Sequence, residues 1–182
     1  MSDTSAPGEL AVVQDFLNTV DLSPVTVDEL REPADLLARL REWQLVDADA
    51  KATRADLARA VDLREALRAL CVVNAGGPLE EDALERIEQA AARAGLGVRF
   101  GPEAVRLEPR RGGVDGALGR LLAIVAGAMA DGTWSRLKAC RMDDCRWAFY
   151  DGSRNRSGAW CSMSSCGNRA KVRAYRTRQR MN

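Results

Sequence analysis

Four cysteines in the C-terminal part of the chain have the spacing of a metal site. Cys140 and Cys145 form one C-x4-C pair, and Cys161 and Cys166 form a second pair after an insert of fifteen residues. Two close pairs separated by a medium-length insert are typical of a four-thiolate zinc site, because each tight turn can supply two adjacent vertices of a tetrahedron. The sequence therefore predicts one structural Zn²⁺ ion held by these four cysteines.

The predicted site is closed, and this limits the chemistry that the chain can carry out. Four thiolates saturate zinc and leave no position for an activated water molecule. The chain contains no histidine, which removes the commonest general base and every Ser-His triad. We therefore expect the protein not to be an enzyme. The alternative for the four cysteines is a pair of disulfides, which a reducing compartment disfavours.

A run of basic residues directly follows the second cysteine pair. Residues 167–180 contain no carboxylate and no proline, so they predict a basic helix. Four arginines share one face of this helix, at steps of four, three and four residues: Arg169, Arg173, Arg176 and Arg180. Lys171 and Arg178 lie on a neighbouring face. Such charges repel one another, whereas phosphates would neutralise them, and a helix fits the major groove of DNA.

The predicted nucleic-acid-binding set extends beyond the helix faces. Arg154 and Arg156, between the cysteine pairs, would add phosphate contacts, and Asn168 could read an adenine edge. The whole set consists of basic and amide side chains: Arg154, Arg156, Asn168, Arg169, Lys171, Arg173, Arg176, Arg178 and Arg180. A basic tail that only solubilises the protein, an RNA-binding module and a protein-docking module are the alternatives. Membrane binding is disfavoured because the helix lacks a large apolar face.

The N-terminal part offers a second, weaker candidate site. Asn18, Asp21, Arg64 and Glu65 would line a pocket if the first and third predicted helices pack together. Arg64 interrupts the apolar side of its helix, which motivates the hypothesis that this pocket binds a small molecule. The preferred alternative is a structural salt bridge between Arg64 and a nearby carboxylate, such as Asp21 or Glu65.

Helices are predicted to position most of these residues. Apolar residues at helical spacing indicate five helices, around residues 9–20, 33–45, 53–73, 84–91 and 118–129. Short alternating runs at 95–100 and 104–109 predict a small β-hairpin. In the C-terminal part, Trp147, Phe149 and Trp160 flank a turn rich in Gly, Ser and Asn, which predicts a hairpin that joins the two cysteine pairs.

The predicted fold class is mainly α, in two parts. Residues 1–133 form a helical domain with a small β-hairpin, and residues 134–182, here called the finger, form a zinc-stabilised knuckle, hairpin and helix. Charge divides the chain at the same point: the finger carries a net charge of +9 and residues 1–133 a net charge of −8. With few apolar side chains in the finger, zinc binding should supply most of its folding free energy.

The expected location is the cytoplasm, in association with the nucleoid. The N-terminus is acidic and lacks the basic and apolar regions of a signal peptide. The longest apolar stretch, at residues 118–132, contains Arg120 and is shorter than a membrane span. The partners expected of the chain are DNA, a small-molecule effector and a second copy in a homodimer, and no membrane.

The C-terminal sequence resembles the CGNR zinc-finger family. The matching elements are the four cysteines, "FYDGSRN" at 149–155, "WCSM" at 160–163 and Cys166-Gly167-Asn168-Arg169 followed by "AKVRAYR". The N-terminal part resembles the ABATE domain through "DFLNTVD" at 15–21 and "DLREALRAL" at 62–70. The resemblance implies a bacterial transcription regulator with four cysteine ligands for zinc, a DNA-binding finger and a helical domain with a sensory role.

Overall fold

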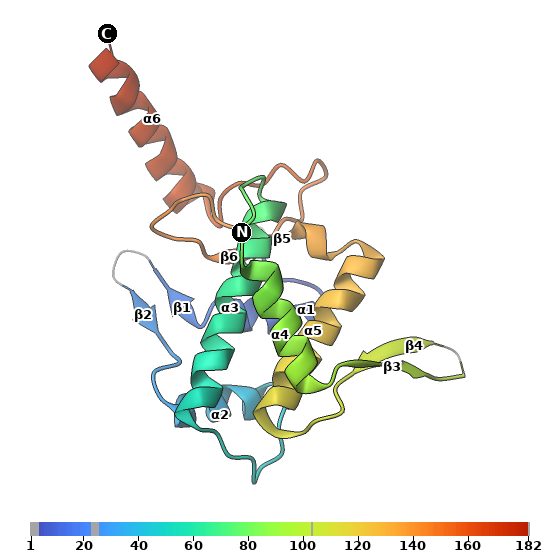
Figure 1. Cartoon of the computed structure of the whole chain (residues 1–182). Coiled ribbons are helices and arrows are strands. Elements are labelled where there is room, and N and C mark those ends of the chain that lie inside the picture. Colours follow the sequence, from blue (N-terminus) through green and yellow to red (C-terminus); the bar gives the residue numbers. More distant parts are fainter. Residues whose placement is uncertain (1–3, 23–25, 103, 182) are drawn as a thin grey trace.

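A helical body carries two projecting elements, a β-hairpin and the C-terminal helix (Figure 1). The computed structural model describes residues 4–22, 26–102 and 104–181, except the side chains of residues 180 and 181. The helices of the body are α1 (Leu10–Leu17), α2 (Pro33–Glu42), α3 (Arg54–Asn74), α4 (Ala83–Ala94) and α5 (Gly113–Asp131). The predicted helices are confirmed, and α5 begins five residues earlier than its apolar stripe indicated.

Local signals explain where these helices begin and end. At the start of α3 the Thr53 hydroxyl accepts from the Asp56 N–H, and the Asp56 carboxylate accepts from the Thr53 N–H, which satisfies donors that a helix N-terminus leaves free. Pro33 opens α2, where its missing N–H costs nothing. Gly95 ends α4 with a φ of 62° and Gly132 ends α5 with a φ of 80°, a left-handed conformation that favours glycine.

The hydrophobic core lies where α1, α2, α3 and α5 meet. Its fully buried side chains are mainly leucines with one aromatic ring: Val13, Phe16, Leu17, Leu36, Leu40, Leu63, Leu67 and Leu121. By length and composition alone α5 could cross a membrane, but half of its apolar stretch is buried in this core. Arg120 on α5 is exposed and donates to the Leu45 carbonyl at 3.0 Å.

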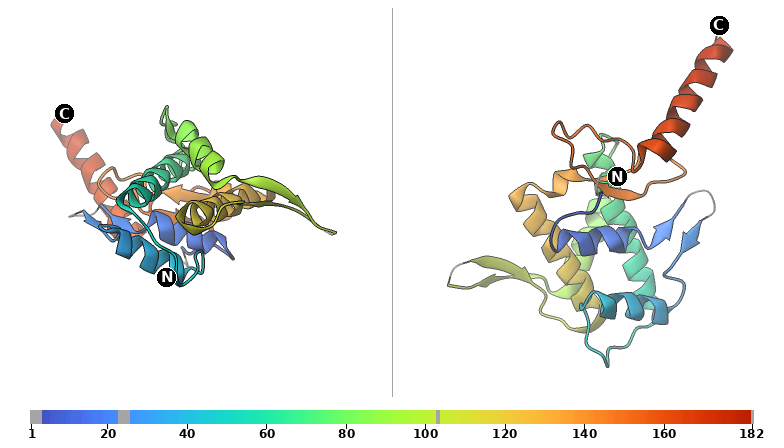
Figure 2. Two further views of the ribbon diagram at one scale, coloured as in Figure 1. Left: turned by 60° about the horizontal axis from the view of Figure 1, so that its bottom comes forward. Right: turned by 180° about the vertical axis from the view of Figure 1, so that it is seen from behind.

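Three two-stranded antiparallel sheets complete the described fold. β1 (Val20–Asp21) pairs with β2 (Val27–Asp28), and β3 (Gly97–Phe100) pairs with β4 (Val105–Glu108), which confirms the small hairpin predicted before α5. This β3–β4 hairpin extends away from the body in every view (Figures 1 and 2). The third sheet joins β5 (Leu137–Ala139) to β6 (Ala148–Tyr150) in the finger.

The hairpin of the finger differs from its prediction in position. β6 pairs with residues that precede Cys140, so the hairpin encloses the first cysteine pair instead of joining the two pairs. Trp160 lies in no strand. Leu137 and Ala139 are fully buried against the helical body, and these tertiary contacts stabilise the extended conformation of β5.

The finger shares the hydrophobic core of the helical body. Trp134, Leu137, Ala139 and Ala148 belong to the same buried cluster as the leucines of α1, α3 and α5. Burial against the body therefore stabilises the first strands of the finger together with zinc. We therefore expect zinc to supply most of the folding free energy of the knuckles and the C-terminal helix, and a smaller share of that of β5 and β6.

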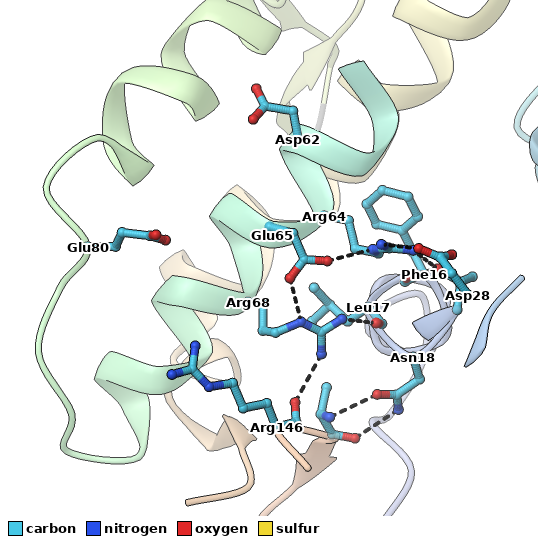
Figure 3. A network of polar contacts seen from close by, with 12 residues as sticks. Phe16, Leu17, Asn18, Asp28, Asp62, Arg64, Glu65, Arg68, Glu80 and Arg146 are labelled. Atoms are coloured by element: carbon cyan, nitrogen blue, oxygen red, sulfur yellow. Dashed lines mark hydrogen bonds and ion pairs between the residues drawn. The ribbon is translucent and has the colours of Figure 1, made fainter. Parts of the chain in front are cut away.

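Two asparagines, one directly after α1 and one at the end of α3, hold the backbone of the finger. The Asn18 amide donates to the Ala148 carbonyl at 2.9 Å and accepts from the Ala148 N–H at 2.8 Å (Figure 3). At the other end of the hairpin, Asn74 donates to the carbonyls of Trp134 and Leu137, both at 2.9 Å. Each amide replaces backbone partners that the edge of a short sheet would otherwise lack.

Asn18→Leu should weaken this joint. Loss of the amide leaves the buried backbone of Ala148 short of partners, and the free energy of unfolding should fall by about 1–3 kcal/mol. Urea denaturation of the zinc-loaded chain measures this, with Asn155→Ala, an exposed asparagine of the finger, as the matched control. Equal stability of the two variants would contradict the role assigned to Asn18.

Candidate metal centre and nucleic-acid interface

Two tight turns bring the four cysteines together. In the first knuckle (residues 140–146) Cys140 follows β5, and the N–H groups of Cys145 and Arg146 donate to the Met142 carbonyl at 2.9 and 3.1 Å. In the second knuckle (residues 161–167) Cys166 lies in a π-helical turn, Met163–Gly167. A Cβ atom at Gly167 would lie 2.7 Å from the sulfur of Met163, so a larger residue there would displace this exposed side chain.

The sulfur atoms have the spacing of a tetrahedral zinc site. All four Sγ atoms lie within 4.8 Å of one another, and the Cys145–Cys161 and Cys161–Cys166 distances are both 3.7 Å. Zn–S bonds of about 2.3 Å in a tetrahedron require sulfurs about 3.8 Å apart. Cys140, Cys145 and Cys166 are buried, and Trp147 and Trp160 pack against the cluster. The geometry fits one structural zinc ion with four protein ligands.

Electrostatics within the cluster also favour a cation. Hydrogen bonds from Cys145 and Cys161 lower the pKa of Cys140, and the contact with Cys140 raises the pKa of Cys145 and of Cys161. Negative charge on Cys140 therefore disfavours negative charge on Cys145 and Cys161. A bound divalent ion replaces the thiol protons and lets all four sulfurs act as thiolates.

The fifth cysteine is chemically separate. Cys71 is completely buried in α3, and burial raises the pKa of its thiol to about 12. It packs in the main core among apolar side chains and lies outside the metal-ligating group.

Arg169, which the sequence assigns to nucleic-acid contact, lies against the metal centre. Its guanidinium donates to the Cys166 Sγ at 3.1 Å and lies 3.4 Å from the Asp144 carboxylate. Arg173 reaches the same carboxylate at 3.0 Å. Asp144 thus ties the first turns of α6 (Asn168–Met181) to the first knuckle. The three-residue step from Cys166 to Arg169 on a helix was the signal that could have predicted the contact.

A buried ion pair, which sequence reasoning missed, shapes the loop at residues 151–158. Lys138 in β5 donates to Asp151 at 2.7 Å and to the Arg156 carbonyl at 2.5 Å. Asp151 also accepts from the N–H groups of Ser153 and Gly158. Burial by itself would raise the pKa of Asp151, but Lys138 and these N–H groups hold it well below its usual value. The sequence signal for this ion pair was the position of Lys138 between the apolar residues Leu137 and Ala139.

Apart from the ion pair between Arg173 and Asp144, the outer part of α6 makes no polar contact with the rest of the described structure. Every residue from Lys171 to Gln179 is exposed, and the helix points away from the body in all views (Figures 1 and 2). Asn168 donates to the Ser164 carbonyl at 3.1 Å, so its amide is already in use at the start of the helix. Arg180 belongs to α6, but its side chain lies outside the described part.

The loop arginines of the predicted set differ from one another. Arg154 is exposed, and among the described residues its side chain has no partner. Arg156 donates to the Ser135 hydroxyl at 3.3 Å through its side chain, and its backbone N–H donates to the Ser153 carbonyl at 3.2 Å.

The four residues of the second candidate site bond to different partners in the described structure. Arg64 is 2% exposed and binds both oxygens of Asp28, at 2.9 and 2.7 Å, and the Glu65 carboxylate at 2.8 Å (Figure 3). Burial would raise the pKa of Asp28, but hydrogen bonds from Arg64 keep it low. Arg64 is thus in the structural salt bridge preferred from the sequence, with Asp28 as a partner that the sequence did not indicate.

The other members of that set have separate surroundings. Asn18 holds the backbone of Ala148, as described above, and Asp21 pairs with Val27 in the β1–β2 sheet. Glu65 alone of the four lines the large cavity of the described structure.

Two models of known protein families match this chain. Residues 10–132, more than half of the chain, match the family model named ABATE, whose description reads "Putative stress-induced transcription regulator". The chain belongs to the ABATE family. Residues 136–179 match the CGNR zinc finger, and this match contains all four cysteines. The comparison with curated proteins finds no match. In this ABATE protein the helical body therefore precedes a CGNR finger with one structural zinc site.

Cys161→Ala should remove the metal. The remaining three thiolates form an open site, and zinc content measured by atomic emission should fall from one ion per chain to well below one. The matched control is Cys71→Ala, which should keep one ion because Cys71 lies outside the cluster. Equal zinc content in the two variants would show that the cluster is not the zinc site.

Arg169→Gln should weaken zinc binding without removing a ligand. The substitution deletes the N–H···S bond to Cys166 and the ion pair with Asp144, and partners of metal ligands contribute about 10- to 100-fold to affinity. Competition with a chromophoric chelator measures the change. Arg178→Gln, on the exposed part of the same helix, should leave the affinity unchanged, and an unchanged affinity in Arg169→Gln would contradict the assignment.

Proposed function

We propose that this ABATE protein regulates transcription by binding duplex DNA through α6. The observation that carries the proposal is the cationic segment Lys171–Gln179, in which every residue is exposed and which contains no carboxylate. Among the described residues, no acidic side chain pairs with Lys171, Arg176 or Arg178. A helix of fourteen residues with like charges is marginal by itself, and a polyanion would stabilise it.

The predicted nucleic-acid residues take different parts in this proposal. Lys171, Arg176 and Arg178 contact phosphates, with Arg180 extending the same helix. Arg173 can turn from Asp144 to a phosphate, since its side chain is 60% exposed. Arg169 and Asn168 instead orient the helix, because their side chains are bonded to the second knuckle.

The loop at residues 151–158 supplies a second group of contacts. Lys138 and Asp151 fix the loop from inside, so Arg154 and Arg156 are presented by a rigid backbone. Two elements that leave the same zinc centre can then contact one duplex, with the protein in the cytoplasm at the nucleoid.

Recognition of single-stranded RNA is the second candidate, and the aromatic residues argue against it. Stacking on unpaired bases requires exposed rings. Phe149 is buried, and Trp147 and Trp160 pack against the cysteine cluster. Tyr175, which is 58% exposed, is the large aromatic ring that α6 presents. The packing therefore supports a duplex partner more than an unpaired strand.

The combined substitution Lys171→Gln and Arg178→Gln tests the proposal. Binding of the zinc-loaded chain to a 20-base-pair duplex, followed by fluorescence anisotropy, should weaken, and the slope of log K against log salt should shrink by about 0.9 for each lost phosphate contact. The combined substitution Arg106→Gln and Arg110→Gln, two exposed arginines in and just after β4, is the matched control. The proposal fails if both pairs have the same effect, or if single-stranded RNA displaces the duplex at equal concentration.

A further inference from the structure

A cavity of about 870 Å³ lies between the helical body and the first knuckle. One wall is the C-terminal half of α3, the second is the loop at residues 75–80, and the third is the segment 139–146 of the finger. Cavities of this size accommodate small organic molecules. The position is notable because one wall contains Cys140, a ligand of the metal centre.

Part of the lining is apolar. Ala69 and Val72 contribute from α3, Pro78 and Leu79 from the loop, and Ala139 from β5. Leu79 is 45% exposed and adds its apolar surface to this side of the cavity. This side of the cavity suits the hydrocarbon body of a ligand.

The carboxylates of the lining are largely neutralised. Glu65 accepts from Arg64 at 2.8 Å and from Arg68 at 3.0 Å, so both of its oxygens are used. Glu80 is paired with Arg86 at 2.9 Å. Asp143 is the one lining carboxylate without an ion-pair partner among the described residues.

Two guanidinium groups at the finger side have no carboxylate partner in the described structure. The Arg141 guanidinium donates to the Ala75 carbonyl, through Nε at 2.7 Å and through Nη2. Arg146 gives its backbone carbonyl to Arg68 at 3.0 Å, while its side chain extends toward the space between α3 and the following loop (Figure 3). With Asp143 as the only opposing charge, the finger side of the cavity has an excess of positive charge.

We propose that this cavity binds a small amphipathic anion. Its carboxylate, sulfonate or phosphate group pairs with Arg146 and Arg141, and its apolar body lies against Ala69, Val72 and Leu79. Such a ligand touches the loop after α3 and the first knuckle at once, so it bridges the helical body and the finger. A regulatory consequence would depend on the proposed DNA binding, but occupation of the site does not.

The test uses 8-anilinonaphthalene-1-sulfonate, a fluorescent aromatic sulfonate, with the zinc-loaded full chain and no DNA. One probe molecule should bind per chain. Arg146→Gln should weaken binding at least about tenfold, since a charge-assisted contact is lost, and Leu79→Asp should weaken it further by placing a negative charge on the apolar wall. Ala69→Phe should abolish binding by filling the cavity, and Leu79→Asp keeps the test valid if that core variant does not fold.

A control variant separates this site from the other exposed apolar surface. Phe100 on the β3–β4 hairpin is 80% exposed and could attract the same probe. Phe100→Ser should leave the affinity unchanged, and inorganic phosphate at equal concentration should not displace the probe. Fluorescence that disappears in Phe100→Ser but persists in Arg146→Gln and Leu79→Asp would overturn the proposal, and so would displacement by phosphate. Neither result bears on duplex binding, which is measured without the probe.

Discussion

Four sulfur atoms within 4.8 Å of one another are the constraint on which the C-terminal structure depends. They cannot all be charged unless a cation lies between them, and neutral thiols would not hold two separate turns together. Once they are held, Asp144 and Cys166 give Arg169 two acceptors, and the direction of α6 follows from that contact. The order of the outer helix is thus linked to the metal centre through Arg169, with Arg173 as a second link through Asp144.

Buried arginines perform the corresponding task in the helical body. Arg68, 3% exposed, donates to the Leu17 carbonyl at the end of α1, to Glu65 on its own helix and to the Arg146 carbonyl in the first knuckle (Figure 3). Removing the Arg68 guanidinium would leave these two carbonyls without their donor, at a cost of about 1–3 kcal/mol for each unsatisfied buried group. α3 therefore fixes α1, the β1–β2 sheet and the finger relative to one another.

Sequence reasoning succeeded where a pattern has one dominant physical cause. The cysteine spacing predicted the zinc cluster, and the apolar spacing predicted the helices, because ligand geometry and burial leave few alternatives. It placed the finger hairpin incorrectly, since Leu137 and Ala139 are extended for the sake of contacts with distant helices. Asp28 as the partner of Arg64, and Asp151 as the partner of Lys138, are likewise decided by tertiary packing, which single-sequence patterns do not contain.

The same limit applies to the roles of the basic residues. In the sequence, Arg169, Arg173 and Arg176 form one uniform stripe. In the structure, Arg169 contacts the metal centre, whereas Arg176, two turns later, is exposed to solvent. Asn18 is a polar residue of the kind that lines ligand pockets, but its amide hydrogen-bonds to the backbone of Ala148. Residue type indicates what a side chain can bond, and the fold decides which partner it meets.

The first knuckle caps the C-terminus of α3, and this contact limits whether the helical body or the finger could be replaced by that of a related protein. Arg141 sits at the C-terminus of α3, where its positive charge complements the helix dipole, and Asn74 at the same end holds the strand that leads into the knuckle. A chimaera that joins this helical body to a foreign finger would lack the cap and the matching strand backbone. Recombination between such proteins should accordingly favour breakpoints that keep α3 and residues 134–150 from the same parent.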